Sequence, residues 1–239
     1  MLSIIVTSYW PKARPYLDLC IESIGNAAIQ CPHEVLIVAP KSYAPQYPNV
    51  NTISPPEESY HNPRALNYGI TAAKGDMLLV LNDDTILTRH SIVNLMGAAQ
   101  QMPKGIVMPL SNDQQRAYMM QVPHTHPGPL PRDMEPHVAR GLMEADSPHL
   151  PGLILPESLC MYAFMMHKSF YQKVGPFDEN LKTGFDDTDY CIRARALGGT
   201  LAIMTSALIY HFGGVSADNT LTAEIRKENE AYFRKKWSV

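Results

Sequence analysis

The sequence predicts an α/β fold in which a mainly parallel central sheet is flanked by helices. Residues 77–81 are apolar without a gap, as in a strand buried on both faces of a parallel sheet. Similar runs alternate along the chain with segments of helical periodicity, and repeated strand–helix–strand units form parallel sheets with right-handed crossovers. We therefore expect a single Rossmann-like domain that binds its ligands at the carboxyl ends of the strands.

The predicted elements follow one another in a regular order. Strands are expected where the chain is apolar or β-branched, at 2–7, 34–39, 49–53, 77–81, 105–109, 159–166 and 201–204. Helices are expected from apolar spacing or from start and stop signals, at 15–28, 62–74, 91–101, 169–174, 191–197 and 222–237. Asn62 and Pro63 suit the start of the second helix, and Gly75 suits its end.

The stretch 111–156 differs from the rest of the chain. Proline and histidine become frequent, the periodicity fades, and only 117–122 resembles a strand. Long irregular stretches inside a compact domain are usually functional, so we interpret this one as a functional loop region rather than a linker. His124 and His126 could share a metal ion there, but no third ligand is near them in the sequence.

The composition is that of a globular protein of ordinary charge. The chain has 239 residues, 45% of them hydrophobic, and a net charge of -3, which does not suggest a nucleic-acid binder. Its 4 cysteines are scattered and are expected to be reduced thiols. The first residues lack the basic start of a signal peptide, and no apolar run reaches the length of a membrane span. We expect a cytoplasmic protein that could meet a membrane only peripherally, at its surface.

A first polar cluster, Asn82-Asp83-Asp84, comes directly after the apolar run 77–81. Ligands bind at the carboxyl ends of strands in open α/β sheets, and adjacent carboxylates there suit a hard divalent cation that holds phosphate oxygens. The structural alternative is a helix start, with Asp84 or Thr85 as the N-cap of the next helix.

A second acidic cluster, which includes Asp186 and Asp187, precedes the helix predicted at 191–197. A helix N-terminus favours ionised carboxylates, and such a group can accept a proton. His211 follows another apolar segment. The alternatives are that Asp187 simply caps a helix from Thr188 and that His211 is a core histidine.

Together these clusters are typical of transfer from a nucleotide-activated donor. Metal-bound phosphate and a carboxylate that accepts a proton are what such a reaction needs. The chain contains neither a Gly-x-Gly-x-x-Gly turn nor a Walker-type phosphate loop, which argues against dinucleotide redox chemistry and P-loop hydrolysis.

Several short segments also carry a resemblance to a known family; they lie at 3–9, 67–76, 81–85, 174–179, 186–194 and 210–216. Each alone is weak, but in this order they resemble family 2 glycosyltransferases of the GT-A fold, most closely the rhamnosyltransferase-like subgroup. The resemblance covers most of the chain from Leu2 to about Ser216.

The resemblance implies one GT-A domain over residues 1–239. Within it, 1–110 would bind the nucleotide-sugar, 111–216 would bind the acceptor and hold the catalytic residue, and 217–239 would form a C-terminal helix. The irregular region around 111–157 would then lie on the acceptor side.

The resemblance also implies residue roles on the metal side. Asn82-Asp83-Asp84 matches the DXD-type motif, in which Asp84 binds a divalent cation, Mn²⁺ or Mg²⁺, that bridges the two donor phosphates. Asn82 stands where many relatives have Asp and would contact the ribose through a neutral amide. His211 matches a histidine that completes the metal site in related enzymes.

The remaining implied roles concern the base and the donor. Asp187 matches the general base of the family, with Asp186 in place of the usual Glu. Donor-binding residues are expected at Thr7, Ser8 and Tyr9 around the nucleoside, at Arg64 near the base or diphosphate, and at Asn67. The second strand lacks the acid with which many relatives contact the nucleotide base, so UDP-, dTDP- and GDP-sugars all remain candidates.

The expected reaction is an inverting transfer of a sugar to an acceptor hydroxyl, in a glycan or glycolipid precursor. One alternative acceptor is a hydroxylated base in DNA, as in some phage enzymes of related fold. A second alternative is a nucleotidyltransferase or a non-catalytic sugar-nucleotide binding module. The basic residues of 222–237 are expected to form a solvated helix face or to meet an anionic acceptor.

Overall fold

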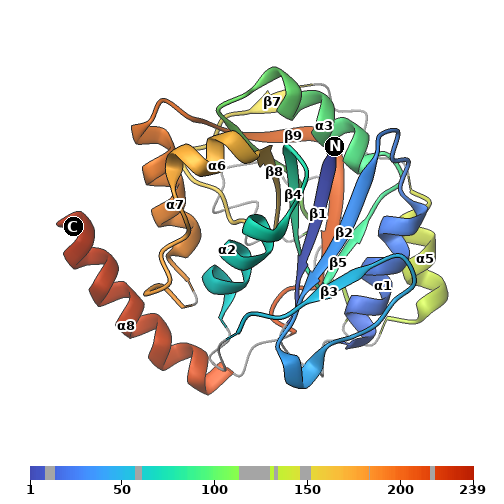
Figure 1. Ribbon diagram of the computed structural model, residues 1–239, viewed down its shortest axis with the longest axis horizontal. Helices are drawn as coiled ribbons and strands as arrows, with labels where there is room; N and C mark the ends of the chain where they lie inside the picture. Colours follow the sequence, from blue (N-terminus) through green and yellow to red (C-terminus); the bar gives the residue numbers. More distant parts are fainter. Residues whose placement is uncertain are drawn as a thin grey trace.

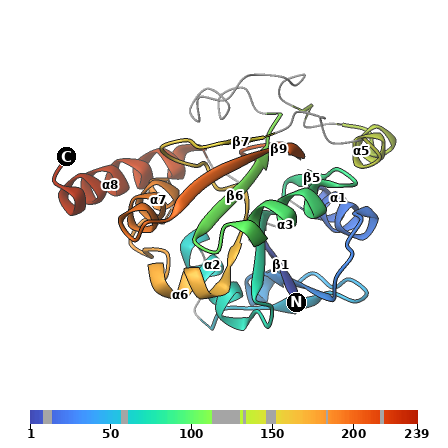
Figure 2. The same cartoon turned by 90° about the horizontal axis from the view of Figure 1, so that it is seen from above.

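The computed structural model describes residues 1–8, 14–56, 61–112, 130–131, 134–145, 152–182, 184–215 and 219–239. In this part of the chain a central sheet carries helices on both sides (Figure 1, Figure 2). Tyr9, the two histidines His124 and His126, and the strand expected at 117–122 lie outside the described residues.

The described strands form one nine-stranded sheet in the order β3-β2-β1-β4-β8-β6-β9-β5, with β7 also paired to β9. Their bounds are β1 (Leu2–Thr7), β2 (His33–Val38), β3 (Asn51–Ile53), β4 (Met77–Asn82), β5 (Thr85–Leu87), β6 (Gly105–Leu110), β7 (Leu153–Ile154), β8 (Ala163–His167) and β9 (Thr200–His211). The pairings make β1, β2, β3, β4, β6 and β9 run in one direction and β5, β7 and β8 in the other. The prediction of a mainly parallel sheet is confirmed.

The helices flank this sheet. They are α1 (Arg14–Asn26), α2 (Asn62–Ala72), α3 (Ser91–Gln101), α5 (Pro136–Met143), α6 (Lys168–Val174), α7 (Asp186–Ala196) and α8 (Asn219–Trp237), with a short 3-10 turn η2 (Lys41–Tyr43). Helix α2 packs on β1 and β2, and α3 packs on β6 and β9. Helix α8 lies beside α7 on the outside of the molecule, far from the sheet (Figure 1).

Several expected boundaries differ from the structure. Strand β8 begins at Ala163 and not at 159, and helix α5 and strand β7 lie within the stretch 111–156, where only 117–122 was expected to be regular. Strand β9 runs from Thr200 to His211, although a strand was expected only at 201–204, and its pairing with β6 shifts register at the polar pair Thr205-Ser206. Residues 85–87 form strand β5, and the N-cap of α3 is His90, so neither Asp84 nor Thr85 caps that helix. Helix α7 begins at Asp186 after the N-cap Phe185, so Asp187 is not a cap either.

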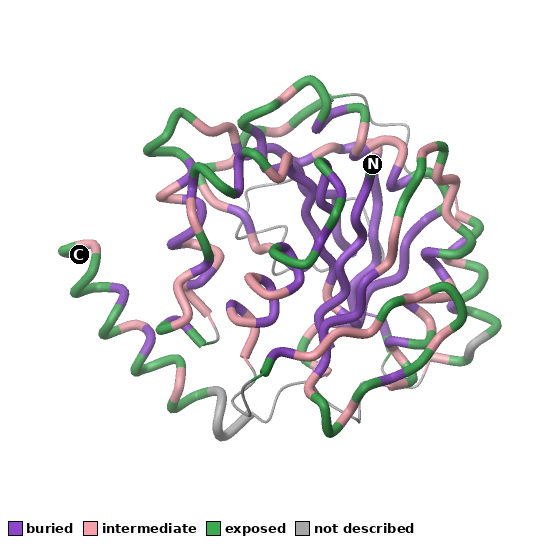
Figure 3. The backbone as a smooth tube through the Cα atoms, viewed as in Figure 1, coloured by how far each residue is buried: buried purple, intermediate pink, exposed green. Residues whose placement is uncertain are grey.

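The core lies around the central strands. Every residue of β1 is buried, and so are the first five residues of β4 (Figure 3). Their register aligns Thr7 with Val38 on one side and with Asn82 on the other. Burial on both faces fixes these strands, so the polar residues that follow them emerge at one defined edge of the sheet.

Among the described residues, no helix combines the length and the apolar character that crossing a bilayer requires.

Gly69 tests how closely α2 must approach the sheet. A Cβ atom there would lie 2.6 Å from Ile5 Cγ2 and 2.7 Å from Val38 Cγ2. We expect Gly69→Ala to lower the free energy of unfolding by about 1–3 kcal/mol, because the added methyl group overpacks this contact. Gly97→Ala in α3 is the matched control: it meets nothing within 4 Å and should be neutral or raise stability by about 0.5–1 kcal/mol. Urea unfolding measures both, and equal effects would contradict the close approach.

Candidate active site

The carboxyl edge of the sheet collects most of the predicted site residues. Strands β1, β4 and β9 run in the same direction, so Thr7, Asn82 and His211 all end at this edge. Helix α7 precedes β9, which starts at the opposite edge, so Asp186 at the start of α7 also belongs to the carboxyl edge. The topology thus places both acidic clusters at one edge of the sheet.

The structure brings Asp84 and His211 into direct contact. Strand β5 pairs with β9 so that Thr85 lies opposite His211, which leaves Asp84 beside the imidazole. His211 Nε2 lies 2.9 Å from Asp84 Oδ1, and both side chains are buried. The N–H of Gly213 donates to the other carboxylate oxygen of Asp84 at 3.0 Å. Gly213 has φ 73°, a conformation that favours glycine in this turn.

Two residues that the sequence did not single out hold His211 in place. The Asn112 Oδ1 atom accepts the backbone N–H of His211 at 2.6 Å, and the ring of Tyr162 stacks on the imidazole at 4.8 Å. The Tyr162 hydroxyl donates in turn to the carbonyl of Leu110 at 3.0 Å. Asn112 is a polar residue three positions after the predicted strand 105–109, and this is the sequence signal that could have identified it.

Asp84 offers the carboxylate oxygen that Mn²⁺ and Mg²⁺ sites use, and the imidazole of His211 suits Mn²⁺ better than Mg²⁺. Manganese accepts both carboxylate oxygen and imidazole nitrogen, and cations that serve phosphate substrates commonly take only one or two protein side chains. The Nδ1 atom of His211 is buried and has no hydrogen-bond partner among the described residues. Among the described residues, no group of three or more His, Cys, Asp or Glu side chains could hold a metal ion.

The second acidic cluster lies at the start of α7. Asp186 is buried, and the Asn62 amide at the start of α2 donates to its Oδ2 at 3.3 Å. Burial, followed by repulsion from the neighbouring Asp187 carboxylate, raises the pKa of Asp186 to about 7. Asp187 is half-buried, and its Oδ1 accepts the backbone N–H of Thr188 at 2.7 Å. The two neighbours therefore differ, and Asp187 has the greater access to solvent.

The residues that were predicted to bind the nucleoside lie at the ends of β1 and β4. Thr7 and Ser8 are buried at the end of β1, and the Ser8 N–H donates to the Val38 carbonyl at 2.9 Å. Asn82 is half-buried at the end of β4, and Asp83 is buried in the turn that follows. Tyr9 lies outside the described residues.

Arg64 and Asn67 lie on α2 and have protein partners. Arg64 Nε forms an ion pair with Glu179 Oε2 at 2.9 Å. The Asn67 amide donates to the Phe177 carbonyl at 2.9 Å and to Glu179 Oε1 at 3.1 Å, while its oxygen accepts from the Tyr171 hydroxyl at 3.0 Å. Asn67 thus anchors the turn after α6. Any contact between Asn67 and a sugar donor would have to form beside these hydrogen bonds.

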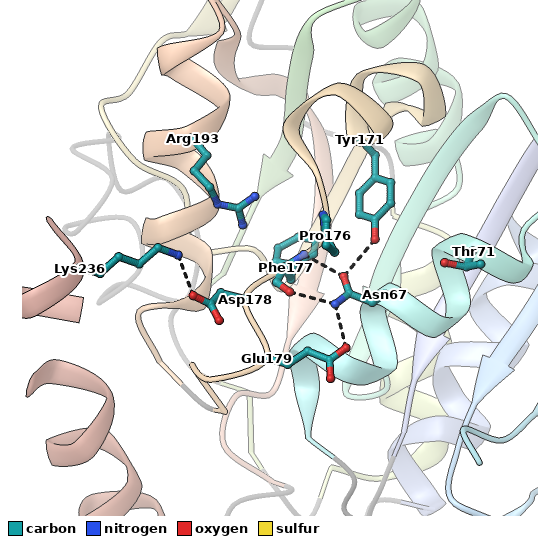
Figure 4. Close-up of a pocket in the computed structure, with 9 residues that line it drawn as sticks. All are labelled: Asn67, Thr71, Tyr171, Pro176, Phe177, Asp178, Glu179, Arg193 and Lys236. Atoms are coloured by element: carbon teal, nitrogen blue, oxygen red, sulfur yellow. Dashed lines mark hydrogen bonds and ion pairs between the residues drawn. The ribbon is translucent and has the colours of Figure 1, made fainter. Parts of the chain in front are cut away.

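Figure 4 shows a pocket between helices. Its volume is about 530 Å³, and neither Asp84 nor His211 is among the residues that line it. It lies between α2, the turn at 176–179, α7 and the end of α8. Its charged side chains are engaged within the protein, because Asp178 pairs with Lys236, Glu179 with Arg64, and Arg193 with Asp189. We interpret it as a seam between helices rather than as the donor site.

The N-terminal part of the chain resembles a known protein family. Residues 3–116 match a family model described as glycosyl transferase family 2. This segment includes β1, β4 and the Asn82-Asp83-Asp84 turn. No curated protein sequence matches the chain.

Solved structures extend the likeness to the rest of the fold. A structure of GalNAc-T7 with UDP, GalNAc and Mn²⁺ matches with a TM-score of 0.63 at 11% identity, over 88% of this chain and 43% of that one. TarS of S. aureus matches with a TM-score of 0.58 at 12% identity, over 88% of this chain and 36% of that one. The chain therefore spans less than half the length of either neighbour, and at such identities the likeness shows the fold. Residues 3–116 thus match glycosyl transferase family 2, and the chain that contains them has the fold of these glycosyltransferases.

Proposed function

We propose that the protein is an inverting, metal-dependent glycosyltransferase that moves a sugar from a nucleotide diphosphate to an acceptor hydroxyl. The observation that carries this proposal is the buried Asp84–His211 pair at 2.9 Å, at the same edge of the sheet as Asp187. A family 2 sequence over residues 3–116 and a glycosyltransferase fold support it.

Asp84 and His211 would hold the divalent cation, Mn²⁺ or Mg²⁺. Such an ion neutralises the negative charge that develops on the departing diphosphate. The GalNAc-T7 structure contains UDP and Mn²⁺, which supports a nucleotide-sugar donor and this metal for the proposed site. Thr7, Ser8, Asn82 and their neighbours at the ends of β1 and β4 would bind the nucleoside, within the half 1–110.

Asp187 is the proposed general base. It is half-buried, so an acceptor hydroxyl can approach its carboxylate, and the helix N-terminus favours the ionised form. Asp186, in contrast, is buried and its pKa is raised to about 7, so Asp187 is the more accessible of the two carboxylates. Attack from the face opposite the leaving group inverts the anomeric configuration.

The proposed acceptor is a hydroxyl of a glycan or glycolipid precursor, bound by residues 111–216. We place the reaction in the cytoplasm, with any lipid-linked acceptor met at the membrane surface. Two basic residues of α8 already form ion pairs, Lys236 with Asp178 and Asp189 and Arg234 with Glu230, which counts against a DNA contact by these two. The rhamnosyltransferase-like subgroup remains part of the proposal.

The base assignment is tested with a panel of UDP-, dTDP- and GDP-sugars, following nucleoside diphosphate release with Mn²⁺ or Mg²⁺. We expect Asp187→Asn to reduce turnover by roughly 10²–10⁴-fold while donor binding persists, because a neutral amide cannot accept the proton. Asp186→Asn is the matched control on the adjacent residue and should retain much more activity, since it imitates the neutral acid. Equal losses in both variants would contradict the assignment, and absence of donor binding by the wild type would contradict the function.

The metal assignment predicts that His211→Ala weakens Mn²⁺ binding in the presence of UDP by about 10-fold or more, since even partners of metal ligands are usually worth that much. Calorimetry measures the affinity, and urea unfolding checks that the variant is folded. His33→Ala, an exposed histidine at the start of β2, is the control and should bind Mn²⁺ like the wild type. Unchanged Mn²⁺ affinity in folded His211→Ala would remove His211 from the site.

The raised pKa of Asp186 predicts a pH dependence of stability. The folded state holds this proton more tightly than the unfolded state, whose carboxyl has the ordinary value of 3.8, so the contribution of Asp186 to stability falls as the pH rises from there to about 7. Asp186→Asn should therefore be more stable than the wild type at about pH 8 and close to it at about pH 4. Urea unfolding at several pH values measures the difference, and a constant difference would mean that burial does not shift this group.

A further inference from the structure

Helix α8 ends on the first turn of α7, the turn that carries Asp186 and Asp187. Asp189 lies in this turn with no exposed side-chain surface. Its carboxylate accepts hydrogen bonds from Lys236 Nζ at 2.7 Å and Trp237 Nε1 at 3.0 Å, both from α8, and from Arg193 Nε at 2.8 Å. A buried carboxylate that loses its partners is strongly destabilising. The contacts of Asp189 therefore hold the end of α8 against the first turn of α7.

Lys236 also binds a second element. Its ammonium lies 2.7 Å from Asp178 Oδ2 in the turn after α6, as Figure 4 shows. Burial alone would raise the pKa of Asp178, but the hydrogen bonds from Lys236 and Asn180 lower it to about 2. One side chain of α8 thus bridges the turn after α6 and the start of α7.

Two further contacts of α8 reach the residues just before α7. The Asn229 amide donates to the Gly184 carbonyl at 3.2 Å, and the ring of Phe233 packs against Phe185 at 5.1 Å. Phe185 has φ 67°, a left-handed conformation that is strained for a bulky residue and needs support from its surroundings. Helix α8 therefore fixes both the strained residue that precedes α7 and the first turn itself.

We propose that Lys236 and Trp237 are positioning residues that set the orientation of Asp187 through the first turn of α7. The inference rests on the proposed function, because it assigns these residues to the reaction in which Asp187 is the base. They act through Asp189, which lies two residues after Asp187 on the same helical turn. A shift of about 1 Å in a catalytic group is enough to reduce rates substantially. Loosening the contacts between α8 and Asp189 should therefore lower turnover.

The charges argue against the other use of this basic helix end, a docking surface for an anionic partner. The Lys236 ammonium lies between Asp178 and Asp189, and both carboxylates are largely buried. Its charge is therefore used within the protein. Lys235, the exposed neighbour on the same turn, supplies a control of equal charge and similar place in the sequence.

The test compares Lys236→Met, Trp237→Phe and Lys236→Arg with Lys235→Met. Lys236→Met keeps a side chain of similar length and removes its charge. Trp237→Phe keeps an aromatic ring and removes the N–H donor. Nucleoside diphosphate release gives kcat and KM for the donor, and amide hydrogen exchange reports protection at 184–190. All variants are measured at a temperature where urea unfolding shows them fully folded.

We expect Lys236→Met to lower kcat by about 10-fold with the donor KM within about 2-fold, and Trp237→Phe to lower it by about 3-fold, since only the orientation of the base changes. Exchange at 184–190 should accelerate in both, Lys236→Arg should restore much of the loss, and Lys235→Met should match the wild type.

Lost protection without loss of kcat would overturn the positioning role, and so would a kcat loss without lost protection. An equal loss of kcat in Lys235→Met would also overturn it, because the effect would then come from the charge of the helix end and not from the contact with Asp189. If the wild type binds donors but releases no nucleoside diphosphate with any acceptor, the proposed function fails and the positioning role fails with it. The exchange experiment then still reports whether α8 clamps the start of α7.

Discussion

The hydrogen-bonded pair of Asp84 and His211 is the interaction on which the site depends. A buried carboxylate is costly unless it is paired, and Asp84 finds its partner only when β5 lies alongside β9. That pairing needs the middle of the sheet, because β4, β8 and β6 separate β1 from β9. The surroundings of Asp84 are therefore set by β9, which belongs to the C-terminal half of the chain.

The sequence predicted the sheet well for a physical reason. Runs such as 77–81 are apolar on both faces, and this pattern has few solutions other than a buried strand. The carboxyl-edge placement of Asn82 to Asp84 then follows from strand direction alone. The pairing of Asp84 with His211, in contrast, was implied by family resemblance, since no local pattern links two residues so far apart in the chain.

The features that sequence reasoning missed are those that tertiary contacts decide. Phe185 adopts a left-handed conformation because the packing around it imposes one, and nothing in its own side chain predicts that. The basic end of α8 resembled a solvated face, yet Lys236 bridges two carboxylates of other elements. Asn67 belongs to a segment that resembles the family, but the structure shows that its amide also holds the turn after α6. Propensity and spacing describe one element at a time, so contacts between elements escape them.

The first turn of α7 shows how three neighbouring aspartates come to differ. Asp186 and Asp189 are three residues apart and share the buried side of the helix, where burial raises the pKa of Asp186 and where Asp189 is paired with Arg193 and Lys236. Asp187 lies between them in the sequence and is therefore turned away from that side, half-buried and beside the helix N-terminus. A general base must be ionised and within reach of its substrate at the same time. Of these three carboxylates Asp187 is the one with accessible surface, which supports its proposed role, and its two neighbours are fixed by α2 and α8.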